Sequence, residues 1–264
     1  PSQIEVKQNG KISIQQIFPW AVASFKGDYL KIPLLKNQLG ITSEERITNS
    51  IQNLEYALAN SFNQLTHPKS RKIAALKGNG ELDDKFIADF FSTLRDSYYI
   101  APFTLDSLSN SPAKTLEQIK EFDLLIIARP TKKFTEKEKY LLDQYIMFGG
   151  STLWLIDKVQ FVNDSVGGND FAFARDLNLT DFFFRYGIRV NSNLVKDLYS
   201  APIILASGEE RESQYNRYPW FYNPLSASNS KHPITTNIEG VKFEYASSID
   251  TLPNSIKKTI LLNS

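Results

Sequence analysis

The turn Gly78-Asn79-Gly80-Glu81 is the segment of this sequence that most resembles a ligand-binding loop. It follows a short apolar run and precedes an amphipathic stretch, and glycine-containing loops between a strand and a helix often hold phosphate groups. The lysine of a P-loop and the third glycine of a dinucleotide fingerprint are both missing. Glu81 would also repel a phosphate. A tight turn in which the glycines adopt positive φ therefore competes with a nucleotide site.

Nucleophilic and metal chemistry find little support among the residue types. The chain has no cysteine, which excludes cysteine nucleophiles and thiolate metal sites. Gly149-Gly150-Ser151 precedes an apolar run instead of following one, so it does not match the G-x-S-x-G elbow of serine hydrolases. The two histidines, His67 and His232, each stand before a proline and lack a second ligand at metal spacing. We therefore expect no catalytic residues, no metal and no cofactor.

Composition narrows the class of partner. The 264 residues include 30 basic and 29 acidic side chains, a net charge of +1, whereas nucleic-acid-binding domains usually show a basic excess. Aromatic residues make up 12% of the chain, which indicates a buried core. No apolar run approaches the ~20 residues of a membrane span. Because the chain begins at Pro1 and still reads as strand where it stops, we interpret it as a piece of a longer protein.

The first part of the chain predicts a β region followed by a long helix. Residues 1–40 contain alternating stretches around Asn9-Gly10, a dipeptide typical of hairpin turns. Thr135 and Glu138 have capping-box spacing, which marks a helix start, and so do Thr42 and Glu45. Apolar residues then recur at steps of three or four as far as Leu65, so we expect one continuous amphipathic helix.

The core of the predicted fold is an alternation of strands and helices. Apolar runs predict strands, and periodic stretches between them predict helices, which implies right-handed crossovers and a mainly parallel sheet. We predict a flavodoxin-like or amidotransferase-like α/β domain over residues 41–264, with helices flanking the sheet, a core at 71–157 and an extension with added strands at 158–264. The expected strands are 73–76, which we place at the centre, 98–105, 124–128 and 152–156.

The carboxyl ends of these strands define a candidate binding crevice. Ligands of doubly wound sheets bind where the strand order reverses, at that edge of the sheet. The predicted order brings Asn79 and Glu81 there, together with Arg129 and Asp157. A salt bridge between Arg129 and Glu81 is the structural alternative to ligand binding.

The extension contains a second candidate surface. We read residues 159–176 as a loop over the sheet and 209–230 as a mobile excursion, with closing strands at 241–246 and 259–262. Aromatic residues together with arginine are typical of interface anchors, and such residues gather in the excursion; folding back over the sheet is an equally good reading. The interface candidates are Arg217, Tyr218, Trp220, Phe221 and Tyr222.

Five segments together resemble one known family, the GldG family of gliding-motility auxiliary proteins of ABC transporters. They are spread from about residue 42 to the end of the chain. Asn79 departs from the family's G-H-G-E form at the glycine turn, which weakens any acid–base role there. The matching segments are Asn49–Leu58, Gly78–Glu81, Asp143–Gly150, His232–Thr235 and Phe243–Asp250.

The resemblance implies a membrane-anchored protein whose large domain faces the periplasm and works beside an ABC permease and a separate ATPase. It implies no catalytic residues, no cofactor and no nucleic-acid partner, and a fold similar to amidotransferase-like and ciliary-transport domains. Two other functions remain open. A degenerate hydrolase would use Glu81 and Asp157, and a solute-binding receptor would need two lobes around a cleft.

Overall fold

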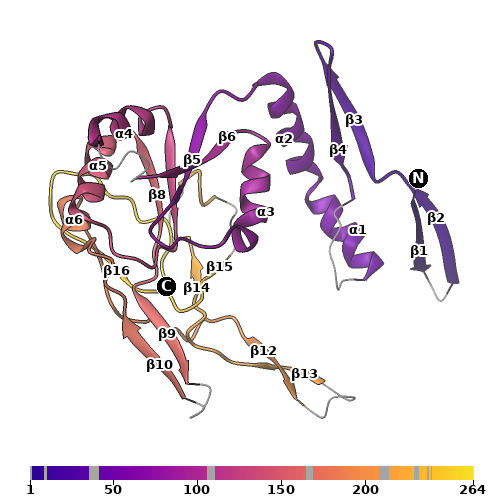
Figure 1. Ribbon diagram of the computed structural model, residues 1–264. Coiled ribbons are helices and arrows are strands. Elements are labelled where there is room, and N and C mark those ends of the chain that lie inside the picture. Colours follow the sequence, from indigo (N-terminus) through magenta and orange to yellow (C-terminus); the bar gives the residue numbers. More distant parts are fainter. Residues whose placement is uncertain are drawn as a thin grey trace. The chain divides into compact units, whose positions relative to one another are not determined.

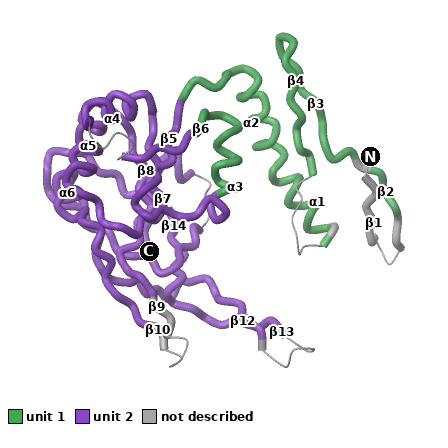
Figure 2. Tube along the Cα trace, in the orientation of Figure 1, with its two compact units in different colours: residues 1–71, 88–100 green, residues 72–87, 101–264 purple. Residues whose placement is uncertain are grey.

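The computed structural model describes residues 2–8, 11–35, 42–105, 111–164, 169–207, 214–228, 232–236, 238 and 240–264. The chain forms two compact units (Figures 1 and 2). Unit 1 comprises residues 1–71 and 88–100, and unit 2 comprises residues 72–87 and 101–264. The domain boundaries inferred from the sequence, at residues 40 and 157, stay predictions.

Unit 1 begins with two antiparallel hairpins; the alternating sequence predicts the first, and the second was not predicted. β1 (Ser2–Gln8) pairs with β2 (Lys11–Ile17), and β3 (Trp20–Phe25) pairs with β4 (Asp28–Pro33). The Asn9-Gly10 turn lies outside the described residues. The N–H of Leu34 donates to the carbonyl of Pro19, which ties the two ends of the second hairpin together.

The helical segment that follows is two helices where the sequence predicts one. α1 (Ser43–Gln52) starts with the expected capping box, in which Thr42 and Glu45 satisfy each other's backbone N–H groups. α2 (Leu54–Thr66) begins after Asn53, a turn residue that stays in the right-handed helical region (φ −86°, ψ −5°). Its side chain makes no capping hydrogen bond. The prediction of one continuous helix was therefore wrong at this residue.

The sheet has the strand order that the sequence predicts. β5 (Lys72–Lys77) lies between β6 (Tyr99–Thr104) and β7 (Leu124–Ala128), and β8 (Ser151–Leu155) pairs with β7 at the other side. β5, β7 and β8 run parallel. The intervening helices are α3 (Asp84–Arg95), α4 (Pro112–Ile119), which the sequence reading missed, and α5 (Glu136–Met147).

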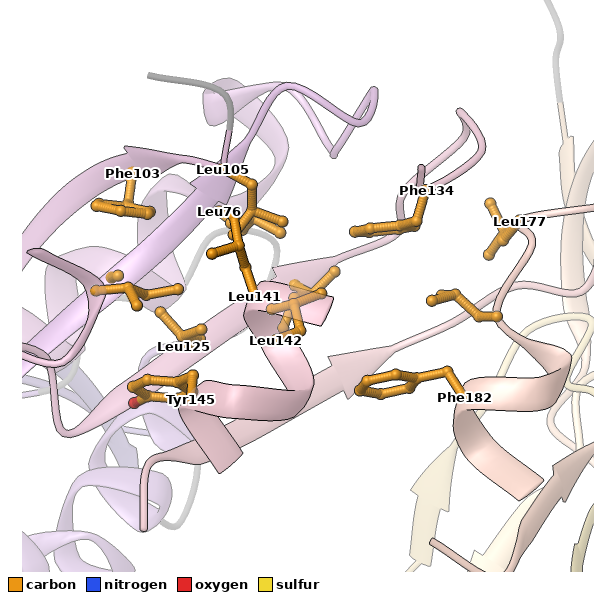
Figure 3. Close-up of a cluster of buried hydrophobic side chains, with 14 of the residues drawn as sticks. Leu76, Phe103, Leu105, Leu125, Phe134, Leu141, Leu142, Tyr145, Leu177 and Phe182 are labelled. Carbon is orange, nitrogen blue, oxygen red and sulfur yellow. The ribbon is translucent and has the colours of Figure 1, made fainter. Parts of the chain in front are cut away.

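Tyr145 of α5 connects the hydrophobic core to the segment that enters β7. It lies in a continuous cluster with Leu76, Leu125 and Leu142, whose side chains face one another in Figure 3. Its hydroxyl donates to the carbonyl of Phe122 at 2.9 Å. Burial raises the pKa of Tyr145 to about 12, so the hydroxyl stays protonated and keeps this bond. A Cβ at Gly150 would overlap the Tyr145 ring, which explains a glycine there.

The extension of unit 2 is richer in strands than the sequence suggests. The expected loop at 159–176 contains a hairpin of β9 (Val159–Asp164) and β10 (Asn169–Ala174). Its alternating pattern was overlooked because polar residues and Gly167-Gly168 dominate the segment. α6 (Thr180–Arg185) and β11 (Ile188–Val190) follow the hairpin.

The expected excursion at 209–230 is likewise partly strand. β12 (Ile203–Ser207) pairs with β13 (Gln214–Tyr218), and β14 (Leu225–Ala227) pairs with β15 (Gly240–Lys242). β16 (Ile249–Thr251), which the sequence reading missed, pairs with β11. Residues 259–262 are not a strand. Among the described residues, 259–262 pair with no strand. Asn263, the residue that follows them, forms an isolated bridge to Ala227.

The Tyr145 hydroxyl gives a direct test of this packing. Tyr145→Phe removes the donor to the Phe122 carbonyl, so we expect the free energy of unfolding in urea to fall by about 1 kcal/mol. Tyr140→Phe, on the exposed side of the same helix, is the matched control and should change it by less than about 0.5 kcal/mol. Equal effects of the two substitutions would contradict the packing described.

Candidate functional site

The loops at the carboxyl ends of β5, β7 and β8 are joined by backbone hydrogen bonds into one cluster. The carbonyl of Asn79 accepts the N–H groups of Thr131 and Lys132 at 2.9 and 2.8 Å. The N–H of Leu82 donates to the carbonyl of Ala128, and that of Arg129 donates to the carbonyl of Leu155. We call this arrangement the carboxyl-end cluster. It contains all four residues for which the sequence predicts a crevice.

Asn79 supports the cluster from inside. Its side chain is buried at 3% exposure, and its Nδ2 donates to Oε1 of Glu138 at 3.1 Å. Glu138 also closes the capping box of α5 with Thr135. Asn79 therefore connects the glycine turn to the start of α5. The sequence reading found the capping box but had no signal for this second contact, because it joins residues 59 positions apart.

The carboxylate of Glu81 occupies the glycine turn, the segment that resembles a phosphate-binding loop. Its Oε2 accepts the N–H of Asn79 at 2.9 Å. Gly78 and Gly80 adopt φ of 118° and 71°, and a Cβ at Gly80 would overlap the Thr131 hydroxyl, so both contact and conformation require glycine at position 80. The turn thus holds its own internal anion. This arrangement disfavours a bound phosphate at the same N–H groups.

Burial raises the pKa of Glu81 above its ordinary value, although backbone N–H groups of Glu81, Asn79 and Gly78 and the charge of Lys77 oppose the shift. The other carboxylate oxygen, Oε1, is buried with no hydrogen-bond partner among the described residues. The protonated form is therefore stabilised relative to an exposed glutamate.

Arg129 pairs with Asp157 and not with Glu81, so the predicted Arg129–Glu81 salt bridge was wrong. Its Nε lies 2.6 Å from Oδ2 of Asp157. Arg129 follows β7 directly and Asp157 follows β8 by two residues, and the parallel register of these neighbouring strands brings both side chains to the same edge. Arg129 has a φ of 53°, which is unusual for a residue with a Cβ.

Two further cations join this edge, and the sequence reading missed both. Lys158 is nearly buried, and its carbonyl accepts the N–H of Arg175 at 2.7 Å. Arg175 follows β10. The charge of Asp157 raises its pKa, and the charge of Arg129 lowers it. Residues 159–176 read as a loop, so nothing in the sequence indicated that a hairpin would return Arg175 to the end of β8.

The five interface candidates divide between two environments. Trp220 and Tyr222 fold back into an aromatic cluster with Tyr245, with ring centroids 5.8 to 6.4 Å apart. Tyr218 and Phe221 remain exposed, as does Arg217. Trp220 and Tyr222 therefore fold back onto Tyr245, and the interface role of Arg217, Tyr218 and Phe221 stays a prediction.

A cavity of about 1020 Å³ lies elsewhere in unit 2, between β8, α6 and the C-terminal segment. Trp154 and Phe182 contribute to its wall, with ring centroids 5.6 Å apart. The sequence reading did not anticipate it, because 259–262 was assigned to a strand.

Within the described ranges, no group of three or more His, Cys, Asp or Glu side chains could hold a metal ion. In the same part of the chain, no helix has the length and apolar character needed to cross a membrane.

The fold and the carboxyl-end cluster define an α/β domain whose loops at the usual ligand-binding edge are tied to one another. Residues 70–264 match the family described as "ABC-type uncharacterized transport system", and the chain belongs to this family of transport-system auxiliary components. Comparison with curated proteins finds no match. A solved structure described as "mmIFT52 N-terminal domain" is 16% identical, with 72% of each chain covered and a TM-score of 0.47.

The raised pKa of Glu81 predicts how stability depends on pH. At neutral pH the folded protein holds a carboxylate that burial disfavours, and this penalty disappears as the pH falls through the folded-state pKa and below the ordinary value of 4.5. Glu81→Gln removes the charge, so its stability relative to the unsubstituted protein should be greatest near pH 7 and decline toward about pH 4.

Urea unfolding at a series of pH values measures this difference. Glu117→Gln, an exposed glutamate on α4, is the control and should show a flat difference across the same range. A Glu81→Gln difference that grows as the pH falls would mean that the turn favours the ionised carboxylate.

Proposed function

We propose that this chain is the extracytoplasmic, non-catalytic binding and coupling domain of a membrane-anchored auxiliary subunit of an ABC transporter complex that serves bacterial gliding motility. Family membership supports the ABC transport system. The sequence resemblance supports gliding motility, bacteria of the Bacteroidetes type and a periplasmic position beside a permease and its ATPase. The observation that carries the binding role is the apolar surface of the β12–β13 hairpin.

The β12–β13 hairpin is a two-stranded ribbon with apolar side chains on both faces. Residues opposite each other in the register share a face. Ile204 therefore lies on the same face as its partner Arg217. Tyr215, two pairs further along the register, lies on that face as well, while Leu205 and Tyr218 point to the other side. Tyr215 is 76% exposed and Ile204 is 59% exposed. Exposed apolar groups that gather in this way mark surfaces for protein partners.

The β9–β10 hairpin offers a second surface of the same kind. Phe171 and Phe173 lie on one face with stacked rings 6.3 Å apart, and both are about half exposed. Phe161 lies on the opposite face and contacts Tyr245 at a ring separation of 4.4 Å, which fixes the hairpin to the aromatic cluster. Both hairpins extend from the body of unit 2 (Figure 1). Large aromatic side chains at such positions are typical interface anchors.

The carboxyl-end cluster supports a role other than hydrolysis. Glu81 accepts a hydrogen bond from its own turn, and Asp157 pairs with Arg129, so each carboxylate is engaged by a neighbour. General acid–base catalysis needs a carboxyl group directed at a reacting atom. The hydrolase alternative would require both contacts to break first.

A comparison of two double variants tests the proposal. Ile204→Ser with Tyr215→Ser should lower recovery of the ABC permease and ATPase subunits from detergent-solubilised native membranes by roughly tenfold or more, since loss of hot-spot contacts costs 2 kcal/mol or more. Tyr140→Ser with Leu198→Ser removes two exposed apolar side chains elsewhere in unit 2 and is the matched control.

Quantitative mass spectrometry of the recovered subunits measures the result. Equal recovery with the two double variants would show that the ribbon is not the docking surface. Failure of the unsubstituted protein to recover any permease or ATPase subunit would contradict the coupling role itself.

A further inference from the structure

Three cationic residues lie at the ends of β7, β8 and β10. Arg129, Lys158 and Arg175, which we call the basic corner, come from three loops that are fixed to one another. The N–H of Arg129 donates to Leu155 at 2.8 Å, and that of Arg175 donates to Lys158 at 2.7 Å. The corner is therefore set by backbone contacts and does not depend on how its own side chains pair.

Arg175 is the group in the corner whose environment calls for an additional partner. Its Nε and Nη1 are buried, and no hydrogen-bond acceptor in the described part of the chain lies within reach of either. Leaving such donors unsatisfied is costly, and the cost is larger for a charged group. The charges of Asp157 and Arg129 act on Arg175, the first attractive and the second repulsive.

The charges around the corner do not balance. Asp157 is already held by Nε of Arg129 at 2.6 Å. Asp176, the next acidic residue along the chain, pairs with Lys133 at 2.5 Å. Asp157 thus lies beside Arg129 and Arg175, and Asp176 lies beside Lys133 and Lys158, and a further negative charge would lower the repulsion between Arg129 and Arg175.

The backbone at Arg129 adds a second, independent sign of function. A φ of 53° at a residue with a Cβ costs free energy, and such conformations persist where the surroundings impose them. The Arg129 guanidinium is half exposed and lies at the edge of the sheet where ligands of parallel sheets bind. The exposed part of Arg129 leaves the corner open to solvent.

We infer that the basic corner binds the oxyanion group of a small ligand, with Arg175 and Arg129 donating to a phosphate or carboxylate and Lys158 adding charge. Arginine N–H groups suit both oxyanions. Nε and Nη1 of Arg175 are buried, so they would reach the bound oxygen atoms after the guanidinium turns outward. The site goes beyond the proposed docking role, because it uses none of the hairpin surface residues.

The glycine turn of the same cluster does not compete for this ligand. Its N–H at Asn79 is satisfied by the Glu81 carboxylate, which already acts as the anion of that turn. An incoming oxyanion is thus directed away from β5 and toward the β7–β8 side. This position differs from that of phosphate in P-loop proteins, where the glycine turn itself holds the ligand.

Isothermal titration calorimetry of the 264-residue chain, at constant ionic strength, tests the inference with two probes, inorganic phosphate and acetate. We expect saturable binding of at least one of them at a single site, and the preferred probe identifies the oxyanion. Arg175→Gln and, separately, Arg129→Gln should each weaken that binding roughly tenfold or more, since a hydrogen bond to a charged group contributes about 1.5–3 kcal/mol.

Arg189→Gln is the matched control, because Arg189 is an exposed arginine of the same unit that pairs with Asp250 at 2.5 Å. It should leave the affinity unchanged. If Arg175→Gln fails to fold by circular dichroism, the exposed Arg129→Gln variant decides the question alone. No saturable binding of either probe, or equal weakening in Arg189→Gln, would overturn the site. The Ile204→Ser, Tyr215→Ser variant should bind the probe normally, so failure of docking and failure of this site are distinguishable.

Discussion

The carboxyl ends of β5 and β7 impose the constraint on which the rest of unit 2 depends. These two strands lie inside the sheet and are almost wholly buried, so the loops that leave them must satisfy their backbone groups within a small space. They do so with each other: the carbonyl of Asn79 takes two N–H groups from the β7 loop, and the β7 loop takes its own acceptor from β8. The position of every charged group at this edge follows from that backbone network.

Much of this arrangement could be predicted from the sequence where the signal is local or periodic. Capping boxes at Thr42 and Thr135 and the apolar runs of the interior strands were sufficient to place two helix starts and the strand order. The prediction failed where a strand depends on a distant partner. Residues 159–164 become strand because they pair with 169–174, and 259–262 fail to become strand because no partner strand lies beside them. Alternation alone cannot distinguish these two cases.

The candidate site shows the same division. Strand-end geometry places Asn79, Glu81, Arg129 and Asp157 in one cluster, and the sequence could supply that because each lies within four residues of the end of a strand. Which of them pair could not be predicted, since the choice of Asp157 over Glu81 as the partner of Arg129 depends on the glycine turn having already taken up the Glu81 carboxylate. The position of Arg175 could not be predicted for a different reason. It depends on the β9–β10 hairpin, which was not predicted.

The closed cluster and the open hairpins suggest that unit 2 separates two tasks. The backbone groups of the glycine turn and the β7 loop are hydrogen-bonded to one another. A protein partner that bound to these two loops would have to displace those hydrogen bonds. The hairpins form two-stranded sheets with apolar side chains left exposed, and a partner that covers them displaces only water. The connection between the two regions is short, because β9 begins immediately after Lys158 and β10 ends immediately before Arg175. If the basic corner binds an anion as inferred, the added charge would lie beside both ends of the β9–β10 hairpin, one of the two surfaces proposed for docking.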